Sequence, residues 1–124
     1  MTTNLVNVKV SHIRPRYNNL KEWMDDPNNV YIGRKGIVFI DGKRFPSKGS
    51  VFANPFKSAK EPGVDVIDKY RTYIIEQIES GAISEEEVTN LKGKTLGCWC
   101  RPERCHGDVL LEILDVWDEY LGEK

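Results

Sequence analysis

The stretch KTLGCWCRPERCHGDVLLEIL, residues 94 to 114, decides the fold of this chain. Its first seven residues are mostly apolar, which predicts a buried strand. Its last part carries apolar residues at helical spacing, which predicts a helix from about Asp108 to Leu121. A strand that leads through a short loop into a helix is typical of α/β proteins.

The rest of the chain alternates strand and helix patterns in the same way. Alternating apolar and polar residues predict a strand from Leu5 to Ile13, and GIVFIDGKRF predicts a hairpin that turns at Asp41-Gly42. Further predicted elements are a strand at 30–33, helices at 20–26 and 64–81, and a short helix opened by the pair Ser84 and Glu87. We expect an α/β fold with a small mixed or parallel sheet of four to five strands flanked by helices.

Size and composition fit one compact unit. With 124 residues, 40% hydrophobic and 30% charged, we expect a single domain over residues 1–124. No apolar run is long enough to span a bilayer, so we expect no membrane partner. The first residues lack the layout of a secretion signal, so we expect a cytoplasmic location. If a virus encodes the protein, this location is the host cytoplasm. The oligomeric state stays open.

Charge is nearly balanced overall but not locally. The net charge is -1, yet residues 34–60 carry seven Lys and Arg residues and a single acid, Asp41. Such a segment is either ordinary solvated surface or a place that attracts phosphate.

All three cysteines and one of the two histidines fall between residues 98 and 106. Cys98 and Cys100 leave the same face of the predicted strand, and Trp99 on the other face is expected to lie in the core. The turn that follows brings Cys105 and His106 back toward the start of the next helix, whose free amides favour a thiolate.

Three interpretations of this cluster stay open. In the first, it binds a metal, most plausibly zinc, through Cys98, Cys100, Cys105 and His106, although the spacing is not a common zinc pattern. In the second, it is a metal-free pocket for a nucleotide-like or phosphate-bearing molecule. The catalytic candidates there are Cys100 or Cys105 as nucleophile, His106 as acid or base and Asp108 as its orienting group, with Arg101 or Arg104 on a phosphate. In the third, the cysteines are buried and Asp108 caps the helix.

Two residues from other segments are candidates for the same site. Arg34 follows the predicted strand at 30–33 and could face a ligand or make a surface ion pair. Asn54 could hydrogen-bond a ligand or form a turn before Pro55.

Four segments carry a family resemblance: VYIGR, SVFANPF, KYRTYI and LKGKTLGCWCRPERCHGDVLLEIL. From about Val6 to Leu114 the chain resembles the family known as domain of unknown function 4326, found in bacteria, phages and other viruses. Ala53 stands where members often carry glycine. The resemblance implies the fold and a site around Cys100, Cys105, His106 and Asp108, completed by Arg34 and Asn54, and it supplies no reaction.

Two functions follow as hypotheses, and neither settles whether the protein is an enzyme. The first is binding or processing of a nucleotide-like or phosphate-bearing small molecule. The alternative is a zinc-stabilised interaction module that binds nucleic acid or a host protein.

Overall fold

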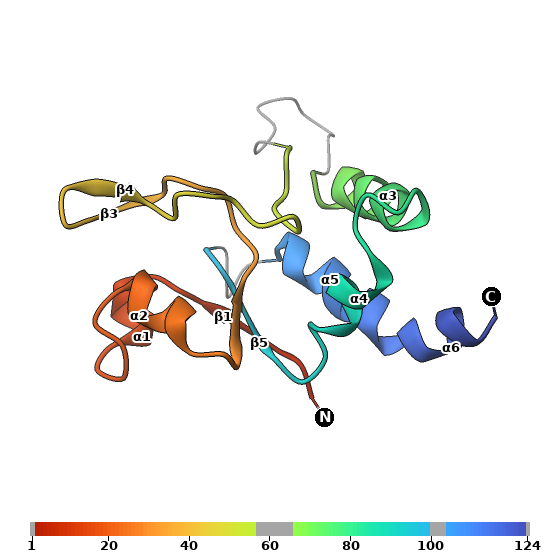
Figure 1. Ribbon diagram of the computed structural model, residues 1–124, viewed down its shortest axis with the longest axis horizontal. Helices are drawn as coiled ribbons and strands as arrows, with labels where there is room; N and C mark the ends of the chain where they lie inside the picture. Colours follow the sequence, from red (N-terminus) through yellow and green to blue (C-terminus); the bar gives the residue numbers. More distant parts are fainter. Residues whose placement is uncertain (1, 57–65, 100–103, 124) are drawn as a thin grey trace.

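The computed structural model describes residues 2–56, 66–99 and 104–123 (Figure 1). Five strands and six helices follow one another along these residues. In chain order they are β1 (Asn4–Asn7), α1 (Val10–Ile13), α2 (Leu20–Asp25), β2 (Asn29–Tyr31), β3 (Val38–Ile40), β4 (Lys43–Phe45), α3 (Val66–Glu79), α4 (Glu85–Thr89), β5 (Thr95–Cys98), α5 (His106–Asp115) and α6 (Trp117–Gly122).

The predicted α/β class is confirmed. Strands β1, β5 and β2 form a parallel sheet in that order, with β5 in the centre, and β3 and β4 form a separate antiparallel hairpin. Helices α3, α4 and α5 lie on one side of the parallel sheet and α1 and α2 on the other (Figure 1). Strand β5 therefore places the start of α5 at the middle of the sheet.

Side chains of β5 alternate between two hydrophobic clusters, one on each face of the sheet. Leu96 and Cys98 belong to the larger cluster, which packs against α3, α4, α5 and α6. Trp99, just past the strand, packs against the smaller cluster, which includes Trp23. Gly97 lies on that second face, where an added Cβ would come 2.4 Å from the Trp23 ring. The central strand therefore needs glycine there, because the tryptophan occupies the space of a side chain.

The β3–β4 hairpin and helix α4 match their sequence patterns. Asp41 and Gly42 have φ values of 52° and 78°, the left-handed pair that a two-residue hairpin turn requires. Ser84 and Glu87 form the predicted reciprocal cap at the start of α4.

Two predicted boundaries are wrong. The first strand ends at Asn7 rather than Ile13, because the Asn7 side chain accepts a hydrogen bond from the Lys9 amide and turns the chain into α1. The last helix begins at His106 and is interrupted at Val116, whose φ and ψ of −111° and 6° are not helical. No helix in the described ranges has the length and apolar character that crossing a membrane requires.

Candidate functional site

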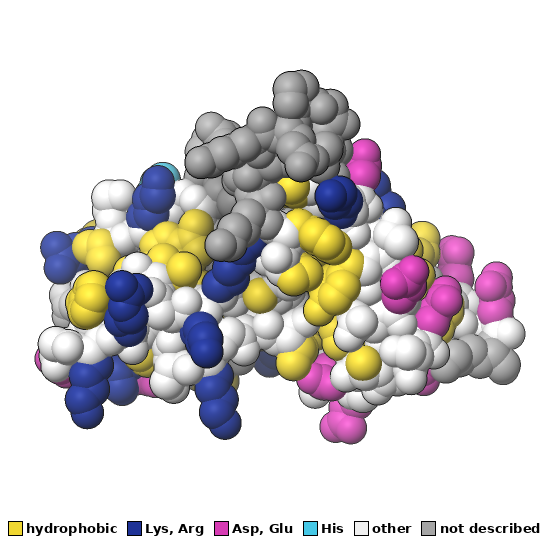
Figure 2. All heavy atoms as spheres, turned by 90° about the horizontal axis from the view of Figure 1, so that it is seen from above, with side chains coloured by type: hydrophobic (Ala, Val, Ile, Leu, Met, Phe, Trp, Pro, Cys, Tyr) yellow, Lys and Arg dark blue, Asp and Glu magenta, His cyan; other side chains and the backbone are white. Residues whose placement is uncertain are grey.

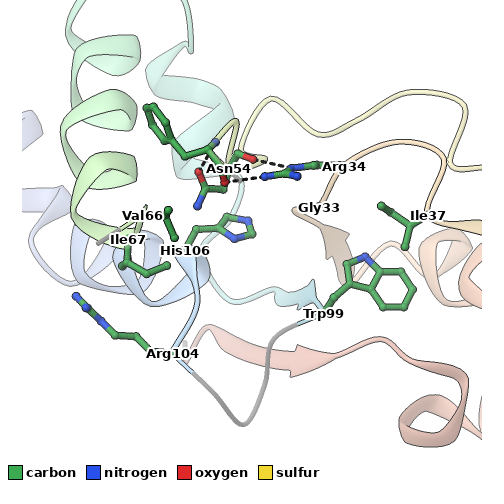
Figure 3. A pocket seen from close by; sticks show the side chains of 10 residues that line it. Gly33, Arg34, Ile37, Asn54, Val66, Ile67, Trp99, Arg104 and His106 are labelled. Atoms are coloured by element: carbon green, nitrogen blue, oxygen red, sulfur yellow. Dashed lines mark hydrogen bonds between the residues drawn. The ribbon is translucent and has the colours of Figure 1, made fainter. Parts of the chain in front are cut away.

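A pocket of about 440 Å³ opens where the parallel strands end and α5 begins (Figure 3). This is the edge at which open α/β sheets generally bind ligands. The residues that line it come from the end of β2, the hairpin, the loop before α3, α3 itself and the segment that joins β5 to α5. They are Gly33, Arg34, Ile37, Asn54, Phe56, Val66, Ile67, Trp99, Arg104 and His106.

The backbone just after β2 is held by three separate groups. The Ile32 carbonyl accepts from His106 Nε2 at 2.7 Å, and the Gly33 carbonyl accepts from the Ser50 amide at 3.0 Å. The Arg34 carbonyl accepts from the Tyr31 hydroxyl at 2.7 Å. Because each carbonyl is bound by a different part of the chain, the position of Arg34 is fixed.

The Tyr31 hydroxyl also links Arg34 to the end of β5. Trp99 Nε1 donates to it at 2.8 Å, so one hydroxyl accepts from Trp99 and donates to the Arg34 carbonyl. Burial raises the pKa of Tyr31, which keeps this donor protonated. A Cβ at Gly33 would lie 2.4 Å from the same hydroxyl oxygen, so only glycine leaves room for the link.

The Arg34 guanidinium crosses to the loop that contains Asn54. Its Nε donates to the Asn54 carbonyl at 2.8 Å, and one Nη donates to the Phe56 carbonyl at 2.7 Å. Across residues 2–56, 66–99 and 104–123, no carboxylate lies within ion-pair distance of Arg34. The guanidinium is thus oriented by neutral carbonyls rather than by an ion pair, and it has further N–H groups to donate.

The side chain of Asn54 is buried, and a hydrogen bond fixes the orientation of its amide group. Asn54 is only 9% exposed, and its Oδ1 accepts from the Phe56 amide at 2.9 Å. This hydrogen bond identifies the oxygen of the Asn54 side-chain amide, so the amide nitrogen Nδ2 is the atom that can donate into the pocket. Nδ2 donates to no described residue, and Figure 3 shows it extending toward the wall that His106 and Val66 form. Asn54 therefore makes the predicted turn and also presents a donor.

Helix α3 supports this loop and the imidazole together. The Tyr70 hydroxyl donates to the Phe52 carbonyl at 2.6 Å, and the Tyr70 ring meets the His106 ring edge-on with centroids 5.0 Å apart. Tyr70 is fully buried. The aromatic ring thus joins the Asn54 loop to the first turn of α5.

The surroundings of His106 favour its neutral form. Burial lowers its pKa below the ordinary 6.5, the hydrogen bond to the Ile32 carbonyl opposes that effect, and the positive charge of Arg34 lowers the pKa further. Because a carbonyl only accepts, Nε2 carries the proton and Nδ1 is the unprotonated nitrogen. An anion bound beside Arg34 would offset the cation and favour protonation of this imidazole.

Cys105 and Asp108 cap α5. The Cys105 sulfur accepts from the Gly107 amide at 3.2 Å, and an Asp108 carboxylate oxygen accepts from the Cys105 amide at 2.9 Å. Cys105 is fully buried, and its Sγ lies 4.0 Å from His106 Nδ1. Neither Cys105 nor Asp108 is among the residues that line the pocket.

The structure brings together some of the predicted site residues. Arg34, Asn54 and His106 share the pocket, whereas Cys98 is fully buried in the larger hydrophobic cluster. Cys100 and Arg101 lie outside the described residues. Within the described residues, no group of three or more Cys, His, Asp or Glu side chains is arranged to hold a metal ion.

The sequence does not predict the part that Trp99 and Tyr31 play at this site. The sequence places Trp99 in the core, yet this residue is half-buried and lines the pocket while packing against the smaller cluster. It predicts Tyr31 only as part of a strand. Alternation along the last strand places Trp99 on the face opposite Cys98, but no sequence pattern shows that Tyr31 is its neighbour, since that depends on the pairing of β2 with β5.

Sequence comparisons relate this chain to viral proteins. The profile of the family described as Domain of unknown function (DUF4326) matches residues 16–116. One relative is an uncharacterized 12.4 kDa protein from the nrdA-td intergenic region of Enterobacteria phage T4, which is 37% identical over 49 residues. The match covers 40% of this chain and 45% of the phage protein, so the chain spans less than half the length of that relative. An uncharacterized protein of Acanthamoeba polyphaga mimivirus is 30% identical over 101 residues, covering 74% of this chain and 71% of the relative. No solved structure matches the chain significantly.

Proposed function

The chain belongs to the family Domain of unknown function (DUF4326), and we propose that its pocket binds the phosphate group of a nucleotide or a related small molecule. The observation that carries this proposal is Arg34, a cation held in place by two backbone carbonyls with no described carboxylate beside it. A fixed arginine of this kind is complementary to a phosphate, which accepts several N–H groups at once.

Other features of the pocket support the same ligand class. Asn54 Nδ2 offers a neutral donor, and His106 can gain a proton when an anion arrives. The volume of about 440 Å³ falls within the range of small-molecule sites. Trp99 and Ile37 give the pocket an apolar part suited to a base or another flat group.

Calorimetric titration with AMP, inorganic phosphate and adenosine tests the proposal. We expect AMP to bind more tightly than adenosine, because only AMP carries the phosphate. Arg34→Gln should weaken AMP binding by roughly tenfold to a hundredfold, the equivalent of about 1.5–3 kcal/mol for a charge-assisted hydrogen bond. Arg16→Gln removes the same charge from an exposed residue outside this pocket and should leave the affinity unchanged.

A second variant separates loss of binding from loss of structure. Asn54→Asp keeps an oxygen that accepts from the Phe56 amide and replaces the Nδ2 donor with negative charge. We expect a folded protein that no longer binds AMP. Equal binding of AMP by wild type, Arg34→Gln and Asn54→Asp, or equal affinity for adenosine and AMP, would contradict the proposal.

A further inference from the structure

The β3–β4 hairpin presents two different faces. Val38, Ile40 and Phe45 pack against the smaller hydrophobic cluster. On the opposite face, Phe39 and Arg44 are paired in register, and Phe39 is 69% exposed. A strongly exposed aromatic ring on a face that contributes nothing to the core suggests contact with another molecule.

Positive charge is concentrated in the hairpin and its flanks. Lys35, Lys43, Arg44 and Lys48 belong to the hairpin and its flanks, and Asp41 at the turn is the single acid between residues 35 and 48. Within the described parts of the chain, none of the four cations has a carboxylate within ion-pair distance. Arg44 instead donates to the Gly36 carbonyl at 3.0 Å and lies over the Phe39 ring, with Cζ 5.1 Å from its centroid.

Charge is unevenly distributed over the face that carries the hairpin. Figure 2 shows Lys and Arg side chains gathered over the half of this face that carries the hairpin, and Asp and Glu side chains over the other half. The net charge is only -1, so the positive potential is local to the hairpin half of this face, where it would attract a polyanion.

We propose that the outer face of the β3–β4 hairpin binds single-stranded nucleic acid. Arg44, paired with Phe39 in register and lying over its ring, contacts a backbone phosphate, and Phe39 stacks on an unpaired base, while the exposed lysines of the hairpin and its flanks add to the positive potential. Combined cations and exposed aromatic rings are the general means of binding single strands without sequence preference. A duplex offers phosphates but keeps its bases stacked inside, so the exposed ring favours the single strand.

Fluorescence anisotropy with a labelled oligothymidylate tests this surface on the full chain. Phe39→Leu keeps an apolar side chain but removes the aromatic face, and we expect about tenfold weaker binding. Arg44→Gln removes the cation that shares this face with Phe39, and it should weaken binding and reduce the slope of log K against log salt concentration by about 0.7. Lys92→Gln removes the same charge from a lysine paired with Asp118 in the acidic half, and should change neither quantity.

Other probes distinguish the remaining explanations. Unchanged oligothymidylate affinity in Phe39→Leu, or equally tight binding of a duplex, would show that charge alone is responsible and would overturn the proposal. Binding to phosphatidylserine vesicles without binding to the oligonucleotide would assign the surface to a membrane instead.

The hairpin proposal is independent of the pocket. Hairpin variants should keep wild-type affinity for AMP, and Arg34→Gln should keep wild-type affinity for oligothymidylate. If Arg34→Gln abolished oligonucleotide binding while Phe39→Leu and Arg44→Gln did not, the nucleic acid would be binding at the pocket, and the hairpin proposal would fail without affecting the phosphate site.

Discussion

Arg34, Asn54 and His106 are separated in the sequence by 20 and 52 residues, yet they line one pocket. The sequence could predict these three because each follows or precedes a recognisable element or lies in a family segment. It could not predict the roles of Trp99 and Tyr31, since their hydrogen bond depends on the parallel pairing of β2 with β5. Strand patterns do not reveal which strands become neighbours.

The pKa of His106 makes stability depend on pH. Burial lowers this pKa in the folded protein below the ordinary 6.5, so the unfolded chain binds the proton more readily. The free energy of unfolding should therefore fall as the pH drops below about 6.5 and stop falling, for this residue, below the folded pKa. Urea unfolding across this range should show the decline in wild type.

His106→Gln is the matched variant for this measurement. A glutamine Nε2 can replace the imidazole donor to the Ile32 carbonyl but does not titrate. The difference between wild type and variant should shrink or vanish as the pH falls. A difference that is independent of pH between about 5 and 8 would show that the His106 pKa is the same in both states.

At the scale of elements, the beginning of α5 shows what local patterns can and cannot predict. The sequence predicts a helix from about Asp108, two residues later than its observed start at His106, and it allows Asp108 to cap the helix, which Asp108 does from the third helical position by accepting from the Cys105 amide. It does not predict Cys105 as the residue before the helix, because cysteine is a weak acceptor and is not a preferred cap. The first strand is predicted too long because the turn made by Asn7 depends on a single side-chain contact.

The Asp108 cap can be tested separately from the pocket. Asp108→Ala removes the acceptor for the Cys105 amide and should lower the free energy of unfolding by about 1 kcal/mol. Asp108→Asn keeps an acceptor oxygen and should recover most of that loss. Denaturant unfolding measures both, and AMP titration should give the same affinity for Asp108→Asn as for wild type. A large loss of affinity in Asp108→Asn would instead assign Asp108 a direct role in the site.

At the scale of the whole molecule, one parallel sheet separates two hydrophobic clusters. Because β5 contributes to both, we expect the clusters to unfold together, as the prediction of a single domain requires. Ile74→Ala in the larger cluster should cost about 2–5 kcal/mol, and Trp23→Ala in the smaller one about 3–5 kcal/mol. Each variant should give one transition in which circular dichroism and tryptophan fluorescence coincide. Two separate transitions would show that the clusters are independent units.

The three carbonyls that follow β2 have a consequence for ligand binding. His106 from α5, Ser50 from the long loop and Tyr31 from the sheet each bind one peptide group next to Arg34. A helix, a loop and a strand therefore hold the main chain at Arg34 before any ligand arrives. Such preorganisation lowers the entropic cost of association, because the arginine does not have to be ordered when the ligand binds.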